Sequence, residues 1–217
     1  MYIGKKHEKF VSEIEKECSN VKVIKSFKLE ELDTYKTLTK NKCSLPDQRN
    51  GSKDTFNYMI MINSKIEFVK DAIERNTYGT KYFSWIDFGI FHVFKQVEKM
   101  SKFLKSFRNV ELQGEFITFP GCWAKGYNIK SVHKSVNWRF CGGFFLGDKE
   151  NMLYFNEITK TNLDKFMKPE KLLWEVNFWT WLEYHTEWEP DVYYADYNES
   201  ILFFPPKYLK LSQNTLK

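Results

Sequence analysis

Asp87 is the residue of this chain whose position best suits chemistry, because it directly follows the apolar pair Trp85-Ile86 and is followed by Phe88-Gly89. Ligands of α/β proteins bind beyond the carboxyl ends of the strands. One carboxylate, together with the oxygens of a diphosphate, can hold Mg²⁺ or Mn²⁺. We therefore predict a divalent metal at Asp87, and the alternative is an aspartate that forms a turn or caps a helix.

Two further residues are candidates for the metal shell. Asp196 follows a short apolar segment, and it could complete the shell or hold the turn that it forms with Tyr197 and Asn198. His92 is a candidate for an additional ligand, with a surface or packed histidine as the alternative. The metal ligands that we predict are therefore Asp87 and Asp196, and His92 is more often expected as a surface or packed residue.

Glu175 is the candidate for proton transfer. It lies in the predicted first turn of the aromatic segment that begins at Trp174. A transferase that uses an acceptor hydroxyl needs a positioned carboxylate to take up the proton, and Glu175 suits that role as a general base. The alternative is favourable interaction of an acidic side chain with the dipole of the helix.

A third group of residues is predicted to contact a phosphorylated ligand. Lys65 could reach its diphosphate, or be a solvated lysine, and Trp85 belongs to the site through its position beside Asp87. Arg139 could grip a phosphate or a sugar hydroxyl with its planar fork, or form a structural ion pair. Gly142 and Gly143 interrupt an aromatic segment, which implies a closely approaching ligand or a β-bulge. The GxxxxGK[ST] pattern of a phosphate-binding loop does not occur.

Helix and strand patterns alternate along the chain, as in an α/β fold. Apolar residues at helical spacing predict helices over 5–18, 56–75, a segment through Phe94 to Leu104, 149–167 and 174–184. Strand formers predict strands over 21–24, 81–86, 115–119, 137–146, 192–195 and 201–204. The segment 81–86 is nearly continuous in apolar character, which predicts a strand covered on both faces. Residues 41–54 predict a long exposed loop.

Composition narrows the class of protein. Hydrophobic residues make up 42% of the chain, which is enough for one domain with a continuous core. The net charge is +5, but 33 basic residues are interspersed with 28 acidic ones, so we predict no nucleic-acid partner. Aromatic residues reach 18%, more than core filling needs, and their ring faces are available for sugars.

The location follows from the cysteines and from hydropathy. The four cysteines form no CxxC pair, which predicts neither a zinc site nor a redox dithiol and favours a reducing compartment. The sequence contains no apolar segment near the roughly 20 residues of a membrane span, nor the apolar core of a signal peptide. We therefore expect a soluble protein in the cytoplasm, or in the host's cytoplasm if the chain is viral.

Four motifs in this order resemble the bacterial HtrL/YibB family, whose members are similar to GT-A glycosyltransferases: Asn57-Tyr58-Met59, Asn63-Ser64-Lys65, Trp85-Ile86-Asp87-Phe88-Gly89, and the segment from Gly142 to Gly147. The resemblance covers residues 55–205. It implies an α/β, GT-A-like mixed sheet flanked by helices, in one domain over 1–217 with an N-terminal part, 1–54, and a motif-bearing core, 55–205. Proteins of that fold normally begin with a buried strand. Either Val21 to Ile24 supplies it, or this fold is shortened at its N-terminus.

The resemblance also implies a function. A nucleotide-sugar donor would bind over the carboxyl edge of the sheet, with Asp87 where these folds carry Asp-x-Asp, and the sugar would pass to a hydroxyl of a glycan or protein. Gly89 replaces the second acid, and Tyr197 stands where a histidine is expected, so the metal would depend on Asp87 with help from Asp196 or His92. The alternative function is a non-catalytic carbohydrate-binding or interaction protein. A phosphate-ester hydrolase ranks third, because the acids are too dispersed for a two-metal centre.

Overall fold

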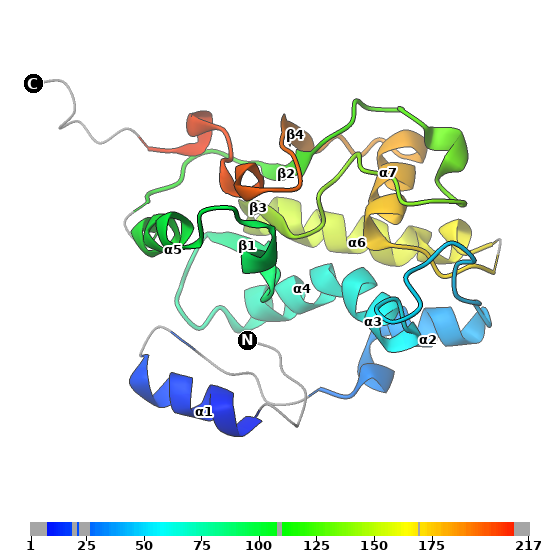
Figure 1. Ribbon diagram of the computed structural model, residues 1–217, viewed down its shortest axis with the longest axis horizontal. Helices are drawn as coiled ribbons and strands as arrows, with labels where there is room; N and C mark the ends of the chain where they lie inside the picture. The colour runs from blue at the N-terminus through cyan, green and yellow to red at the C-terminus, as the bar shows by residue number, and fades with distance from the viewer. Residues whose placement is uncertain (1–7, 19–20, 22–26, 108–109, 169, 211–217) are drawn as a thin grey trace, which may run out of the picture.

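A computed structural model describes residues 8–18, 21, 27–107, 110–168 and 170–210. Within this part of the chain, helices flank one mixed sheet of four strands (Figure 1). The α-helices are α1 (Glu8–Glu17), α2 (Asp33–Lys40), α3 (Phe56–Asn63), α4 (Lys65–Arg75), α5 (Val97–Ser106), α6 (Lys149–Phe166) and α7 (Glu175–His185). The strands are β1 (Tyr82–Ile86), β2 (Ile117–Gly121), β3 (Phe144–Asp148) and β4 (Asp191–Tyr194). Short 3-10 helices are η2 (Leu29–Glu31), η3 (Ile90–Val93), η5 (Ile129–Ser131), η6 (Glu199–Leu202) and η7 (Pro206–Tyr208).

The direction of the strands brings distant segments to one edge of the sheet. The strand order is β1-β3-β2-β4. Strand β3 runs antiparallel to both β1 and β2, and β4 runs parallel to β2. The carboxyl ends of β1, β2 and β4 therefore lie at the same edge, next to the start of β3. The residues that follow these three strands share that edge with Gly142 and Gly143.

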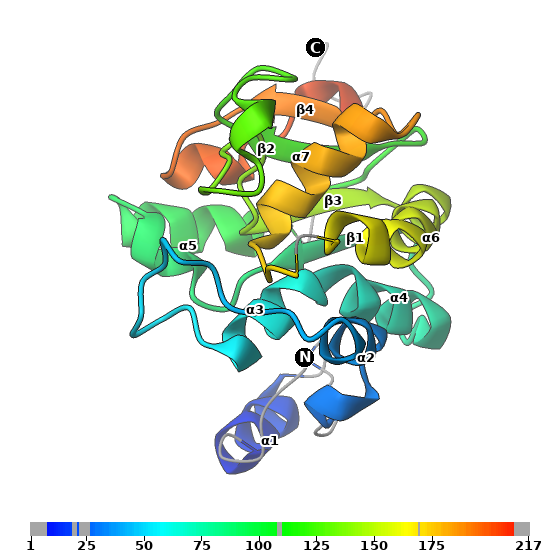
Figure 2. The ribbon, with the colours of Figure 1, turned by 90° about the vertical axis from the view of Figure 1, so that its right-hand side faces the viewer.

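The two faces of the sheet carry separate hydrophobic clusters because side chains of a strand alternate between faces. Phe145 of β3 packs in the larger cluster with residues of α4, α6 and α7. Its neighbours Phe144 and Leu146 pack in the smaller cluster with Ile90 of η3 and Met100 of α5. Figures 1 and 2 show α5 and α6 on opposite sides of the strands. Helix α1 lies at the end of the molecule opposite β4 in both views.

Asp148 ends β3 and starts α6, the longest of the described helices. Its buried carboxylate accepts hydrogen bonds from the backbone N–H groups of Glu150 and Asn151, which are otherwise unpaired in a first turn. It also accepts one from the backbone N–H of Phe116, at 2.6 Å. One side chain thus caps the helix and fixes the segment that enters β2.

The predicted helix over 56–75 is two helices, so that prediction was wrong about continuity. Ser64 separates α3 from α4 with φ −94° and ψ 3°. Its hydroxyl donates a hydrogen bond to the carbonyl of Ile60, at 2.8 Å, a bond that competes with the regular backbone pattern. The apolar positions that predicted the helix are all buried, as expected: Met59, Ile62, Ile66, Val69 and Ile73.

Three strand predictions were wrong in part. Strand β1 is an edge strand and is not covered on both faces, since Ile86 is 39% exposed. Residues 137–143 precede β3 and are not a strand, so the paired glycines lie before the strand. Residues 201–204, predicted as a strand, contain the end of η6. The segment 22–24 of the predicted first strand lies outside the described residues.

Other predictions are confirmed to within a few residues. Helix α6 matches the predicted 149–167, α7 matches 174–184, and β1 matches 81–86. The predicted strand 192–195 corresponds to β4. The predicted helix through Phe94 begins later, at Val97, after the short η3.

Gly121, at the end of β2, tests how tightly this edge is packed. A Cβ atom there would lie 2.1 Å from the carbonyl oxygen of Arg139 and 2.8 Å from Cγ1 of Val192. Overpacking typically costs about 1–3 kcal/mol, so we expect Gly121→Ala to lower the melting temperature by roughly 2–12 °C. Gly51→Ala is the matched control, because no atom lies within 4 Å of its Cβ position. Equal melting temperatures of the two variants would contradict this packing.

Candidate functional site

A cavity of about 820 Å³ opens at the carboxyl edge of the sheet. Its walls come from the loop over 47–54, from α3 and the start of α4, from the residues after β1, from the segment over 136–143, and from the start of α7. Of the predicted site residues, it brings together Lys65, Trp85, Asp87, His92, Gly142, Gly143 and Glu175. The cavity therefore collects residues that are far apart in the sequence.

Lys65 is the centre of this site and is 3% exposed. Its ammonium donates to the carbonyl oxygen of Gly142 at 2.7 Å and to Oε1 of Glu175 at 2.8 Å. It also lies 3.0 Å from Oδ1 of Asp87. An ammonium has three donors, and here each has an acceptor. The alternative of a solvated Lys65 is therefore wrong, and the predicted contact with a diphosphate would need a change in this arrangement.

The two carboxylates determine the charge of the site. Burial alone would lower the pKa of the Lys65 ammonium, but Glu175 and Asp87 outweigh it and raise that pKa above the usual lysine value. Burial raises the pKa of the Glu175 carboxyl, and the charge of Lys65 opposes this. With all three groups ionised, one positive and two negative charges leave this trio with a formal charge of −1.

Asp87 is the member of the trio that faces the cavity, and 38% of its side chain is exposed. The indole N–H of Trp85 donates to Oδ1 of Asp87 at 2.6 Å, which fixes the orientation of the carboxylate. The following helix η3 has Gly89 as its N-cap and receives no side-chain cap. Asp87 therefore does not cap η3, but it does begin a turn, because the backbone N–H of Ile90 donates to its carbonyl oxygen at 2.9 Å.

The paired glycines are explained by side chains of the protein itself. A Cβ atom on Gly142 would lie 2.3 Å from Oε1 of Glu175, and one on Gly143 would lie 2.8 Å from Cδ1 of Ile90. The sequence predicted a ligand or a β-bulge at this point. In the structure, Gly142 allows Glu175 to reach Lys65, Gly143 allows η3 to pack beside Asp87, and both glycines also line the cavity.

Arg139 and Asp196 do not line the cavity. Arg139 forms a two-point ion pair with Glu183, with Nε–Oε2 at 2.8 Å and Nη2–Oε1 at 2.5 Å, and it also donates to the carbonyl of Trp123. This is the structural ion pair that the sequence left as an alternative. Asp196 is exposed, and its carboxylate accepts a hydrogen bond from the backbone N–H of Tyr197, as in the predicted turn.

The described residues do not form a site for a divalent metal by themselves. They contain no group of three or more His, Cys, Asp or Glu side chains that could hold one. Oδ1 of Asp87 accepts from the indole of Trp85 and lies 3.0 Å from the Lys65 ammonium, which donates to Oδ2 at 3.3 Å. His92 lines the cavity but pairs with Tyr197, with Nε2 at 2.7 Å from the hydroxyl. The predicted ligands are thus not assembled around Asp87.

Several residues of the cavity were missed in the sequence. Arg49 and Lys53 lie on the loop predicted only as exposed, and no local pattern marks a loop lysine or arginine as part of a site. Tyr58 and Trp138 also line it. The high aromatic content was the one signal for them, and it did not indicate which rings would converge.

The spacing of the cysteines in the sequence did not predict that two of them are in contact. Sγ of Cys122, after β2, lies 3.5 Å from Sγ of Cys141, just before Gly142. Both are free thiols, and burial raises the pKa of each. Thiols with a raised pKa are poor nucleophiles near neutral pH, so we assign them no catalytic role.

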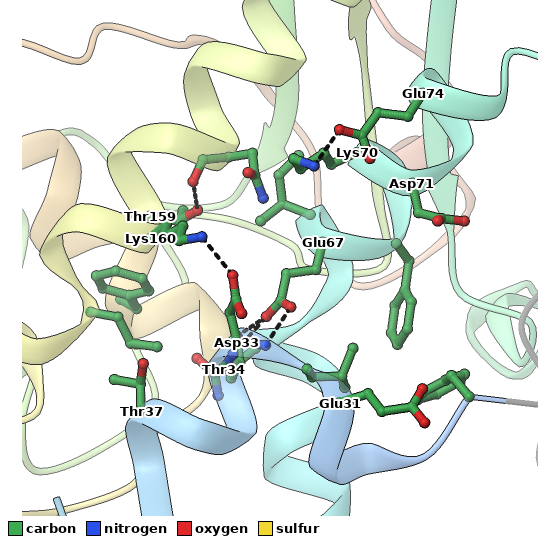
Figure 3. A pocket seen from close by; sticks show the side chains of 18 of the residues that line it. Glu31, Asp33, Thr34, Thr37, Glu67, Lys70, Asp71, Glu74, Thr159 and Lys160 are labelled. Carbon is green, nitrogen blue, oxygen red and sulfur yellow. Dashed lines mark hydrogen bonds and ion pairs between the residues drawn. The ribbon is translucent and has the colours of Figure 1, made fainter. Parts of the chain in front are cut away.

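A second cavity, of about 420 Å³, lies among α2, α4 and α6 (Figure 3). Glu67 of α4 accepts hydrogen bonds there from the backbone N–H groups of Asp33 and Thr34, at 2.9 and 2.8 Å, and thereby caps α2. Lys160 of α6 pairs with Asp33 at 2.7 Å. These polar groups satisfy one another and join three helices, so we interpret this cavity as structural.

Fold and cavity define a mixed α/β protein with a cavity lined by polar and aromatic residues at the carboxyl edge of its sheet. The chain belongs to the HtrL_YibB family, described as bacterial protein of unknown function, whose model matches residues 5–173. The match includes Lys65, Asp87 and the paired glycines, and it ends two residues before Glu175. Comparison with curated proteins and with solved structures finds no match. No described helix has the length and apolar character to cross a membrane.

Replacing Lys65 tests the central ion group. Lys65→Met keeps a similar volume but leaves two carboxylates without their cation, and breaking a buried pair costs about 3–5 kcal/mol. We expect a loss of this size in the free energy of unfolding, measured by urea denaturation. Lys70→Met on the same helix removes an exposed pair with Glu74 and should cost about 0.5 kcal/mol or less.

A double variant separates charge from packing. If the uncompensated charge of Glu175 causes the loss, Lys65→Met combined with Glu175→Gln should be more stable than Lys65→Met alone. If the double variant lost as much stability as the two single variants together, the pairing of Lys65 with Glu175 would be contradicted.

Proposed function

We propose that this protein is a glycosyltransferase that binds a nucleotide-sugar in the 820 Å³ cavity and transfers the sugar to a hydroxyl acceptor. The observation that carries the proposal is Asp87, a carboxylate held by Lys65 and Trp85 at the carboxyl edge of the sheet, with its side chain open to the cavity. A carboxylate in this position can accept hydrogen bonds from sugar hydroxyls. The resemblance that we expect between the HtrL/YibB family and GT-A enzymes favours the same assignment.

The size and walls of the cavity support a sugar ligand. Small-molecule sites have volumes of about 300–1,000 Å³, and this cavity lies in that range. Rings of Trp85, Trp138 and Trp174 contribute to its walls, and the ring of Phe88 at its rim is 79% exposed. Aromatic faces pack against the apolar faces of sugar rings, while the carboxylate provides the polar contact.

Glu175 is the proposed general base. Burial raises the pKa of its carboxyl, and a base acts best when its pKa lies near the working pH. Oε1 of Glu175 pairs with Lys65, so the proton of the acceptor hydroxyl would go to this carboxylate beside a fixed positive charge. Lys65 and Gly142 position Glu175, and Trp85 positions Asp87.

Binding and turnover should separate the roles of the acids. In calorimetry against a panel of nucleotide-sugars, we expect Asp87→Ala to weaken binding about tenfold or more, the loss of a hydrogen bond to a charged group. Glu175→Gln should retain binding and lose about 10²- to 10⁴-fold in turnover. Asp196→Ala is the matched control, because that exposed carboxylate lies at the same edge but outside the cavity. No binding of any nucleotide-sugar would refute the proposal.

A second candidate is a carbohydrate-binding protein without turnover. The observation that favours it is the closed state of the trio: Lys65 has an acceptor for each donor, and Glu175 is 6% exposed. Binding on a glycan array that Trp138→Ala weakens, combined with no transfer from any nucleotide-sugar, would establish this function instead.

A further inference from the structure

We infer, as an extension of the proposed glycosyltransferase function, that the donor diphosphate binds Arg49 and Lys53 at the rim of the cavity without a divalent metal, and that Lys65 is the cation that serves Asp87. The sequence predicted that the diphosphate is held by a divalent metal at Asp87 and contacted by Lys65. Three features of the site support the different arrangement.

The trio around Lys65 is unsuited to a diphosphate. The Lys65 donors are directed at Gly142, Glu175 and Asp87, at 2.7 to 3.0 Å. Two carboxylates and one ammonium give the trio a negative formal charge, which repels phosphate oxygens. A neutral sugar, by contrast, can donate its hydroxyl protons to Asp87. The sugar end of the donor therefore belongs here, and the phosphates belong elsewhere.

A divalent ion has no favourable place beside Asp87. Oδ1 of Asp87 accepts from the indole of Trp85 at 2.6 Å and lies 3.0 Å from the Lys65 ammonium. A metal bound to this carboxylate would lie close to that ammonium, and like charges at such distances repel strongly. Within the described residues, no cluster of three acidic, histidine or cysteine side chains compensates for this. Lys65 already supplies the positive charge that a metal would bring.

Arg49 and Lys53 provide the positive charge for the diphosphate. Both side chains line the cavity and are exposed. Arg49 donates from Nη1 to the carbonyl of Pro46 at 3.1 Å, and the ammonium of Lys53 lies 5.3 Å from the centre of the Tyr58 ring. In the part of the chain that the structure describes, neither forms an ion pair with a carboxylate. The planar fork of arginine matches phosphate oxygens at two points.

The acids near these cations are already engaged. Asp47 also lines the cavity, and its carboxylate pairs with Lys171, which does not line it. Asp54 is buried and accepts a hydrogen bond from the backbone N–H of Asn50 at 3.0 Å. The amide of Asp54 donates in turn to the carbonyl of Asn50 at 2.8 Å. This reciprocal pair closes the turn between Arg49 and Lys53 and holds both on the same short loop.

Calorimetry with and without metal tests the inference. The probes are nucleoside diphosphates and nucleotide-sugars, titrated into the intact chain in EDTA and in Mn²⁺. We expect dissociation constants that agree within about threefold in the two buffers, because no step of binding requires the metal. Arg49→Ala with Lys53→Ala should weaken binding about 100-fold, since each charged hydrogen-bonding group contributes roughly tenfold. Lys40→Ala with Lys134→Ala removes the same charge from exposed positions outside the cavity and should change little.

The outcomes separate this inference from the proposed function. Binding that appears only with Mn²⁺, or binding that the Arg49 and Lys53 variant leaves unchanged, overturns the inference and leaves a nucleotide-sugar site in place. Absence of binding under both conditions overturns the two together. Both variants alter exposed side chains, so their melting temperatures should match that of the unaltered protein and confirm that they are folded.

Discussion

The buried ammonium of Lys65 is the interaction on which the rest of the site depends. Lys65 lies at the start of α4. Its ammonium joins α4 to the residue after β1, the turn before β3 and the first turn of α7, which lie 22, 77 and 110 residues further along the chain. A buried charge is tolerated only when it is paired and hydrogen-bonded. Because Glu175 and Asp87 both supply that pairing, the positions of α4, β1 and α7 are coupled to one another at the edge of the sheet.

The site also requires that its segments approach one another closely, and glycines at three positions make this possible. Gly142 leaves room for the Glu175 carboxylate, Gly143 leaves room for Ile90, and Gly121 lets β2 pass the backbone of Arg139. The sheet itself supplies the direction: β1, β2 and β4 end at one edge while β3 begins there. An added Cβ would displace Glu175, a partner of Lys65, at Gly142, the side chain of Ile90 at Gly143, and neighbouring backbone at Gly121.

The wall of the cavity carries two chemically different groups of residues. The trio presents one partly exposed carboxylate in an aromatic surrounding, which suits uncharged hydroxyl groups. The loop over 47–54 presents Arg49 and Lys53, which suit anions. A nucleotide-sugar has the same two parts in sequence, a sugar and a diphosphate. This correspondence connects the geometry to the function proposed for a member of the HtrL_YibB family.

The sequence by itself determined the elements with strong local signals. Helical spacing of apolar residues located α6 and α7, strand formers located β1, and the place of Asp87 after that strand marked the site. Local patterns could not reveal the break at Ser64, the pairing of Arg139 with Glu183, or the loop residues that line the cavity. Only the tertiary structure decided that Lys65 is a buried partner of two carboxylates and not a solvated lysine. The physical reason is that burial and ion pairing depend on segments brought together from across the chain, which spacing within one segment does not encode.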